Sequence, residues 1–275
     1  MLNNRVVLVV LDALKFETAC THMGFMQHLL EQKKVARFEV RGELPSMSRP
    51  MYETILTGTP VMEHGIYHNL VNRKSKEQSI FHLLQAKGRT SAAAAYHWVS
   101  ELYQKSPFQP FEDRIQLQTD LPITSGIFYF EDHYPDSHVY ADANFLLEHN
   151  NPDFLYIHPM NIDDDGHKHS GDSVEYRNRV LAADSLLSLN IPKWLALGYN
   201  VVVTADHGMT KDGNHGGNSV EDRHVPLFIL SKCVKPGVYG EMISQLQIAP
   251  LVCHLLQLEP SSKMVPLQLP CLVEE

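Results

Sequence analysis

The residues best suited to chemistry lie in one stretch, VVVTADHGMTKDGNHGG, at positions 201–217. Asp206 and His207 follow an apolar, β-branched run, and His215 precedes two glycines that allow close approach of the backbone to a ligand. Carboxylate oxygen and imidazole nitrogen are ligands of divalent cations such as zinc. The pattern predicts metal ligands in the loop after a buried strand, with a helix-capping acid beside a hydrogen-bonded buried histidine as the alternative.

Two other segments contain the same residue types. Asp12 ends the apolar segment RVVLVVLDA, and Asp163 lies four residues before His167 in NIDDDGHKHSG. Taken singly, Asp12 could cap a helix and the second segment could be a solvated acidic loop. Taken together, the candidates form two ligand sets with open coordination positions, as catalytic sites require. The first set is Asp12, Asp206 and His207, and the second is Asp163, His167 and His215.

A candidate nucleophile precedes a predicted helix in ELPSMSRPMYETILTGTP. Pro50 suits the first turn of a helix that extends to about Leu56. Ser48 is then next to the helix N-terminus, where N–H groups and the helix dipole favour an anion. A metal ion that also binds Ser48 would stabilise its ionised hydroxyl at neutral pH. Simple capping of the helix by Ser48 is the alternative.

Apolar strand-like segments alternate with helical patterns along the chain, which indicates a layered α/β fold with a mainly parallel sheet. Ligands of such sheets bind beyond the carboxyl ends of the strands, where Asp12, Asp163 and Asp206 fall. The predicted strands are 5–13, 35–40, 90–96, 153–159, 200–205 and 226–231. The predicted helices are about 15–32, 50–57, 77–87, 172–188 and 244–257.

No linker-like segment divides the 275 residues, so we predict one domain over 1–275. Residues at about 97–140 interrupt the alternation with a mixture of aromatic, proline and acidic residues, and we expect a small inserted cap there. Its aromatic residues either line the substrate or form the core of the cap itself.

The motifs, in this order, resemble the alkaline phosphatase superfamily, and most closely its nucleotide pyrophosphatase/phosphodiesterase branch. That family binds two metals with a strand-terminal Asp, a Ser or Thr before x-Pro, a D-x-x-G-H-type motif, D-H-G-M and a later His. The matching residues are Asp12, Ser48 in Ser48-Arg49-Pro50, Asp163 with Gly166-His167, Asp206-His207-Gly208-Met209, and His215. The resemblance spans residues 12–217 and implies a three-layer, alkaline phosphatase-like sandwich.

Two further assignments depend on the resemblance. Asn69 falls where the branch has an asparagine that donates to a phosphate oxygen. Arg49 and Met51 depart from the branch, which often has an aromatic residue after the nucleophile and an asparagine two positions beyond it. We therefore expect Arg49 to bind a second phosphate or a carboxylate of the substrate rather than a nucleobase to stack there.

The resemblance and the residue chemistry together imply hydrolysis of a phosphodiester through a phosphoserine intermediate. Ser48 would attack phosphorus between two metal ions, while Asn69 and the backbone N–H after Ser48 hold the remaining oxygen. Zinc suits the Asp/His ligands, and manganese is the alternative. The few basic residues near the ligand loops favour a diester. A phosphomonoesterase or phosphotransferase of the same superfamily, and a non-catalytic binding protein held together by metals, are the alternatives.

Composition narrows the partners and the location. The net charge of −9 disfavours binding to nucleic acid or to an anionic membrane, so the expected partner is a small phosphate ester or nucleotide-like molecule. The four separated cysteines predict reduced thiols, and no segment resembles a signal peptide or a transmembrane span. These features predict a cytoplasmic protein and leave its oligomeric state open.

Overall fold

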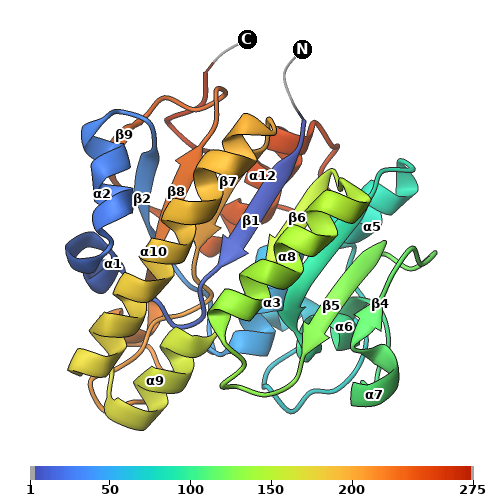
Figure 1. The fold of residues 1–275 in the computed structure, drawn as a ribbon, viewed down its shortest axis with the longest axis horizontal. Coiled ribbons are helices and arrows are strands. Elements are labelled where there is room, and N and C mark those ends of the chain that lie inside the picture. Colours follow the sequence, from blue (N-terminus) through green and yellow to red (C-terminus); the bar gives the residue numbers. More distant parts are fainter. Residues whose placement is uncertain (1–3, 274–275) are drawn as a thin grey trace.

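One mixed sheet forms the centre of the molecule. The computed structural model describes residues 4–273. The strands are β1 (Val6–Val10), β2 (Ala36–Arg41), β3 (Ser91–Tyr96), β4 (Ile115–Gln116), β5 (Ser125–Tyr129), β6 (Phe154–Ile157), β7 (Asn200–Thr204), β8 (His224–Leu230) and β9 (Gly237–Ser244). Their order in the sheet is β4-β5-β3-β6-β1-β7-β8-β2-β9 (Figure 1). β8 runs antiparallel to both of its neighbours and β4 runs antiparallel to β5, while the other neighbours are parallel.

Strand β1 lies in the middle of the sheet, and all five of its residues are buried. Val7 pairs with Leu155 of β6 on one side and with Val201 of β7 on the other. Both faces of these strands are covered by helices, and for this reason their sequences are continuous apolar runs rather than alternating ones. The buried middle of the sheet holds the strand ends that point toward the candidate site.

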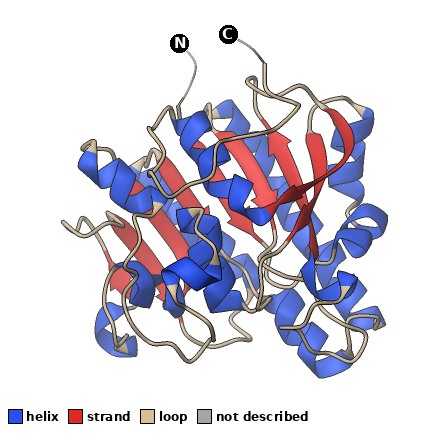
Figure 2. Ribbon diagram, turned by 180° about the vertical axis from the view of Figure 1, so that it is seen from behind, coloured by secondary structure: helices blue, strands red, loops and turns tan. Residues whose placement is uncertain are grey.

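Helices form a layer on each face of the sheet. The helices are α1 (Phe16–His22), α2 (Gly24–Glu31), α3 (Ser48–Thr57), α4 (Val61–His64), α5 (Ile80–Ala86), α6 (His97–Tyr103), α7 (Pro110–Asp113), α8 (Asp136–Asn150), α9 (Asn161–His169), α10 (Val174–Ala196), α11 (Val220–Arg223) and α12 (Ile248–Leu256), with a 3-10 turn at Gln245–Gln247. One layer contains α8 and α10, with α1 and α2 packed beside α10 (Figure 1). The other contains α3, α5 and α12 (Figure 2). The expected three-layer α/β sandwich is confirmed.

Several element boundaries differ from the expected ones. The predicted helix at 15–32 divides at Met23 into α1 and α2. The acidic segment after β6, expected as a turn or loop, is the helix α9. Strand β9 was not predicted, because it is an edge strand with mostly exposed side chains and no continuous apolar run. None of these differences moves a predicted ligand away from the carboxyl edge of the sheet.

The segment at about 97–140 is not wholly an insertion, because it supplies part of the layered fold. β5 pairs in parallel with β3 from Ala92↔Ser125 to Tyr96↔Tyr129, and α8 begins within the same segment. The remaining part, with α6, α7 and β4, lies at that edge of the sheet. β5 was not predicted as a strand, because it is short and an acidic segment follows it directly.

The helices of residues 4–273 include none with the length and apolar character that a membrane span requires.

Candidate active site

The candidate site lies where β1, β6 and β7 end side by side. Asp12 comes two residues after β1, and Asp206 comes two residues after β7. Backbone hydrogen bonds continue beyond the strands, from Leu11 N to Thr204 O at 2.8 Å and from Asp12 N to Pro159 O at 3.1 Å. These bonds hold the three strand ends together, so the polar side chains that follow them converge on one point.

The first predicted ligand set is gathered around His207. Its Nε2 lies 3.3 Å from Asp12 Oδ1 and 3.4 Å from Asp206 Oδ2. Its Nδ1 is 2.9 Å from Gly208 O, and a proton on Nδ1 for this bond leaves the lone pair of Nε2 directed at the two carboxylates. Asp206 Oδ1 accepts from Ala13 N and His207 N, which leaves Oδ2 as its free oxygen. Metal sites orient their ligands with outer hydrogen bonds of this kind.

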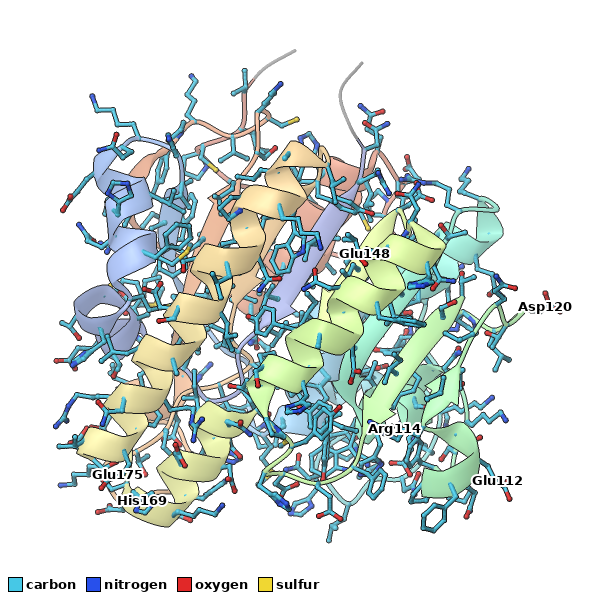
Figure 3. The ribbon with its side chains drawn as sticks, viewed as in Figure 1. Glu112, Arg114, Asp120, Glu148, His169 and Glu175 are labelled. Carbon is cyan, nitrogen blue, oxygen red and sulfur yellow. The ribbon has the colours of Figure 1, made fainter. Side chains whose placement is uncertain are left out.

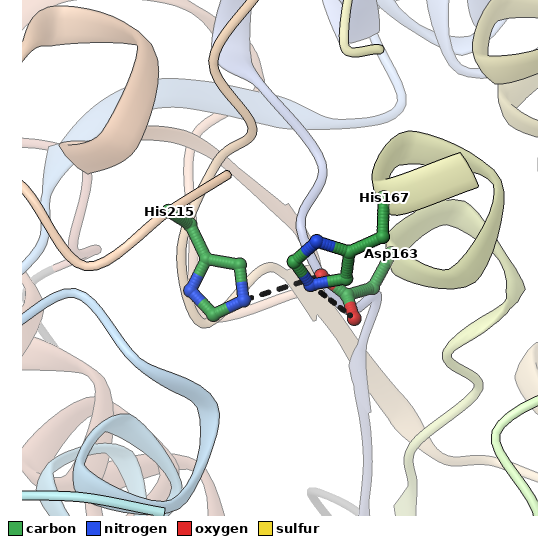
Figure 4. Close-up of side chains that lie close together, drawn as sticks. All are labelled: Asp163, His167 and His215. Carbon is green, nitrogen blue, oxygen red and sulfur yellow. Dashed lines mark ion pairs between the residues drawn. The ribbon is translucent and has the colours of Figure 1, made fainter. Parts of the chain in front are cut away.

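The second predicted set is also brought together, as Figure 4 shows. Asp163 and His167 lie one turn apart on α9, and Asp163 is 3.4 Å from His167 Nε2 and 3.6 Å from His215 Nε2. His167 Nδ1 bonds to Gly213 O at 2.8 Å, and His215 Nδ1 bonds to Ser46 O at 3.1 Å. Both histidines therefore present Nε2 toward the same carboxylate.

The two sets adjoin each other. The rings of His207 and His215 are stacked with centroids 3.9 Å apart. Ligand atoms of Asp12, Asp163 and His207 also lie within 4.8 Å of one another, although these residues come from both sets. Such spacing is compatible with a centre that holds two neighbouring cations.

Three buried carboxyl groups in the candidate site have oxygens that a bound cation would satisfy. Asp12 Oδ1, Asp163 Oδ1 and Asp206 Oδ2 are buried and accept no hydrogen bond from the described residues. Burial raises the pKa of all three carboxyls, and the neighbouring carboxylates raise those of Asp12 and Asp163 further. Burial lowers the pKa of His207 and His215 to about 3, so both imidazoles are neutral, as metal ligands must be. This donor set fits divalent metal ions.

His158 is a candidate ligand that the sequence interpretation missed. It directly follows β6, it is fully buried, and its Nε2 lies 3.2 Å from Asp12 Oδ2. Burial lowers its pKa to about 4. Ligand atoms of His158, Asp12 and Asp206 lie within 4.8 Å of one another. Its position directly after an apolar strand is the signal that singled out Asp12 and could have found His158 as well. Tyr52 completes the surroundings of Asp12 by donating its hydroxyl to Oδ2 at 2.9 Å.

Ser48 is the first residue of α3, and Met47 holds the N-cap position. Capping is therefore not the role of Ser48. Its Oγ lies 3.1 Å from His207 Nε2, at the edge of the first ligand set. Its backbone N–H makes no hydrogen bond within the described part of the chain, so a helix N-terminal donor is free beside the hydroxyl. Hydroxyl, free N–H and carboxylates share one small volume.

Asn69 lies beside the nucleophile. Its Oδ1 accepts from Arg49 N at 3.0 Å, which orients the amide so that its Nδ2 is the group left to donate. We expected Asn69 and the backbone N–H of Arg49 to donate to a phosphate oxygen, and the structure supports only the first of these two donors. The N–H of Arg49, predicted to hold a phosphate oxygen, is engaged by Asn69, whereas the N–H of Ser48 itself is unengaged.

Arg49 has different partners from the substrate group that we expected. Its guanidinium is buried, lies 2.5 Å from Glu101 and donates to Val71 O at 2.9 Å. It also packs over the ring of Trp98, 4.7 Å from the centroid. Glu101 neutralises the charge, since a buried arginine requires a paired anion. Arg49 therefore supports the wall behind the site and offers no free charge to a second phosphate.

These observations can be compared with known proteins. A profile of the family described as type I phosphodiesterase / nucleotide pyrophosphatase matches residues 6–222. The chain belongs to this family, whose members cleave or transfer phosphoric esters, so the resemblance drawn from the motifs is confirmed.

Solved structures share the fold across nearly the whole chain. Murine ectonucleotide pyrophosphatase/phosphodiesterase 5 superposes with a TM-score of 0.75 at 14% identity and covers 96% of this chain and 97% of that one. The alkaline phosphatase PafA superposes with a TM-score of 0.73 at 11% identity and covers 99% of both chains. At these identities the likeness shows the fold alone.

The curated relatives that the chain resembles in sequence are named as transferases rather than as phosphodiesterases. GPI ethanolamine phosphate transferase 2 of Debaryomyces hansenii is 24% identical over 280 residues, which covers 92% of this chain and 30% of the relative. The human GPI ethanolamine phosphate transferase 2 catalytic subunit is 23% identical over 247 residues, which covers 85% of this chain and 24% of the relative. The chain thus spans less than a third of the length of these relatives.

Proposed function

We propose that the chain is a metal-dependent phosphodiester-cleaving enzyme that transfers a substituted phosphoryl group, such as ethanolamine phosphate, through Ser48 to an acceptor hydroxyl. The observation that carries the proposal is the position of Ser48 Oγ, 3.1 Å from His207 Nε2 at the N-terminus of α3 and beside buried, unpaired carboxylates. From the sequence we favoured hydrolysis and kept transfer as an alternative. The curated relatives, transferases by name, favour the alternative.

The residues that would hold the metal ions are the two predicted sets with His158 added to the first. Divalent ions there would stabilise the ionised hydroxyl of Ser48 and the negative charge on the phosphoryl oxygens. Zinc remains the metal that we expect, with manganese as the alternative.

The residues of the chain divide the remaining work. Ser48 Oγ forms a bond to phosphorus as the bond from phosphorus to the leaving oxygen breaks, which leaves a phosphodiester on Ser48. Ser48 N–H and Asn69 Nδ2 donate to a phosphoryl oxygen, and such preorganised donors are each worth about 100-fold or more in rate. The N-terminus of α3 favours the same negative charge.

The second step decides the type of reaction. An acceptor alcohol attacks the phosphorus, restores the Ser48 hydroxyl and carries away the substituted phosphoryl group. Attack by water instead gives a phosphodiesterase, which is the second candidate and is favoured by the family profile. GPI, named in the relatives, is the acceptor class to test first. Its use would replace our expectation that only a small molecule and no membrane is involved.

The test follows p-nitrophenol release from bis-p-nitrophenyl phosphate and p-nitrophenyl phosphate, with Zn²⁺, with Mn²⁺ and with chelator. Mass spectrometry of the products in the presence of an added alcohol separates transfer from hydrolysis. We expect metal-dependent turnover that favours the diester and is lost in Ser48→Ala. Ser185→Ala, an exposed hydroxyl on α10, serves as the matched control. Equal turnover by wild type and Ser48→Ala would sink the proposal. If the added alcohol is present but is not incorporated into the products, the result would favour the phosphodiesterase.

A further inference from the structure

Beside the metal-binding residues, the carboxyl ends of β3 and β5 contribute side chains that the proposed chemistry does not use. β3 neighbours β6 in the sheet and β5 neighbours β3, so the two strand ends continue the same edge. Tyr96 ends β3, Trp98 follows it in α6, and Asp132 lies three residues after the end of β5. A substrate bound at Ser48 would extend over this part of the edge.

A continuous chain of contacts connects Asp12 with Asp132. Tyr52 donates to Asp12 and contacts Trp98, with ring centroids 6.4 Å apart. Trp98 lies edge-on to Tyr96 with centroids 4.9 Å apart, and Tyr96 donates its hydroxyl to Asp132 Oδ1 at 2.8 Å. The aromatic residues thus form a wall that begins at a metal-binding carboxylate and ends at an exposed one.

The backbone of Asp132 is also tied to the metal-binding helix. Asn161 Nδ2 donates to Asp132 O at 3.2 Å and to Tyr134 O at 3.0 Å. Asn161 begins α9, two residues before Asp163. The loop after β5 is therefore held at the start of the helix that supplies the second ligand set.

The carboxylate of Asp132 has no ion-pair partner among the described residues, and Lys168, whose charge reaches it, is paired with Asp164 at 2.6 Å. None of the ion pairs within residues 4–273 includes Asp132. The nearby Arg49 is paired with Glu101. Because Asn161 holds the backbone of Asp132 at the start of α9, two residues before Asp163, the charge of Asp132 would also act on a bound phosphate. A carboxylate there repels a plain anionic phosphate ester but attracts a substrate that carries its own cation.

We propose that Asp132 binds the ammonium group of an amino-alcohol phosphodiester, with Tyr96 orienting the carboxylate and Trp98 covering the carbon chain between nitrogen and phosphorus. The inference rests on the proposed function and names the substrate class of the same site. Ethanolamine phosphate, the group in the names of the curated relatives, has this arrangement of charges.

The test compares two chromogenic diesters of the same shape, 2-aminoethyl p-nitrophenyl phosphate and propyl p-nitrophenyl phosphate. We expect wild type to have a higher kcat/KM for the aminoethyl ester. In Asp132→Asn, kcat/KM should fall about threefold for the aminoethyl ester, mainly through KM, because an exposed ion pair is lost. It should rise for the propyl ester, since repulsion of the phosphate is removed. A merely structural role for Asp132 would lower both.

Two further variants sharpen the result. Tyr96→Phe, which removes only the hydroxyl that bonds to Asp132, should weaken the preference in the same direction. Asp120→Asn makes the same charge change at an exposed acid before β5, away from the carboxyl end of that strand (Figure 3), and should leave the preference intact. Equal kcat/KM of wild type for both esters, or an unchanged preference in Asp132→Asn, would overturn the subsite alone.

Failure of the proposed function would look different, since neither ester would then be turned over by metal-loaded wild type. Calorimetric binding of O-phosphoethanolamine and propyl phosphate to metal-loaded Ser48→Ala still tests the subsite in that case. Tighter binding of O-phosphoethanolamine, lost in the Ser48→Ala, Asp132→Asn double variant, would support it. Equal binding of the two compounds would overturn it.

Discussion

At the scale of single residues, burial decides the protonation of the candidate ligands. Burial opposes charge on both acids and bases, so it raises the pKa of Asp163 and lowers the pKa of His215 to about 3. Burial thus keeps the imidazoles of His207 and His215 neutral and opposes ionisation of Asp12, Asp163 and Asp206 in the absence of a cation. The chemistry of the centre thus comes from where these groups are buried as much as from what they are.

We predict that His158→Asn reduces both bound metal and activity. His158 Nε2 lies 3.2 Å from Asp12 Oδ2, so it either binds a metal ion or orients the carboxylate that does. Loss of such a group costs about 10- to 100-fold in metal affinity or rate. Metal content after dialysis and kcat/KM on bis-p-nitrophenyl phosphate measure the effect. Full metal content with an unchanged rate would remove His158 from the centre.

Glu53 predicts a pH dependence of stability that has no connection with the metal. It is buried in α3, accepts hydrogen bonds from Ser75 and Tyr103, and burial raises its pKa to about 7 from the ordinary 4.5. Below pH 4.5 folded and unfolded chains are both protonated there. Between pH 4.5 and 7 only the unfolded chain ionises freely, so stability falls across this window by up to about 3 kcal/mol and levels off once Glu53 ionises in the folded chain too.

The variant Glu53→Gln should therefore lose this decline and be more stable than wild type at pH 8 relative to pH 5. Urea denaturation at several pH values measures the difference between the two proteins. Glu112→Gln, a change at an exposed acid of α7 (Figure 3), is the matched control and should leave the decline in place. Parallel pH profiles for wild type and Glu53→Gln would contradict the prediction.

At the scale of elements, the loop between β7 and α11 supplies ligands to both sets, and a glycine allows it to fold. A Cβ on Gly208 would lie 2.0 Å from Glu221 O, a backbone atom that cannot shift without displacing the chain around it. Gly208 N also donates to Asp222 O at 2.8 Å. Glycine in Asp206-His207-Gly208 thus lets the two ends of this loop approach each other closely enough to bring His207 beside His215.

Gly208→Ala should displace His207 and lower kcat/KM by about 100-fold, since an error of about 1 Å in a catalytic group has an effect of that size. The melting temperature should fall as well. Gly240→Ala in β9 is the control, because a Cβ there meets nothing within 4 Å. Wild-type activity of Gly208→Ala would mean that the close contact is relieved without moving His207.

At the scale of the whole molecule, we predict that divalent metal raises the melting temperature. Three buried carboxylate oxygens without hydrogen bonds oppose folding until a cation joins them. A ligand at about a thousand times its Kd contributes about 4 kcal/mol, or about 10 °C for a chain of this size. The rise should be larger at pH 7.5 than at pH 5.5, because raised carboxyl pKa values make protons compete with the metal.

Differential scanning fluorimetry with Zn²⁺, Mn²⁺ and chelator measures this rise. The double variant Asp163→Asn, His215→Ala should lose part of it, whereas a control change at the exposed His138 should not. Identical melting temperatures with metal and with chelator would contradict a metal centre at these residues. The cytoplasmic location stays a prediction at this scale.

The fold and most candidate ligands were predictable because their signals are local. Continuous Val and Leu runs mark strands covered on both faces, and parallel strands bring their carboxyl ends to one edge. The sequence alone could therefore place Asp12, Asp163 and Asp206 close together. The motif around Ser48 and Pro50 likewise predicted a helix N-terminus beside them. Strand β9 lacked such a signal, since an edge strand with exposed side chains has no apolar run.

The residue types and their order along the chain by themselves determined the family and the layered fold, and they predicted the two candidate ligand sets. Only the tertiary structure decided which partner each side chain has, because pairing depends on distances between segments far apart in sequence. In the folded chain Arg49 forms an ion pair with Glu101, 52 residues away, and His158 after β6 lies beside Asp12 after the adjacent strand β1. It also placed Asp132 at the rim, where the Tyr96 hydroxyl donates to it, a position that no pattern in the sequence indicated.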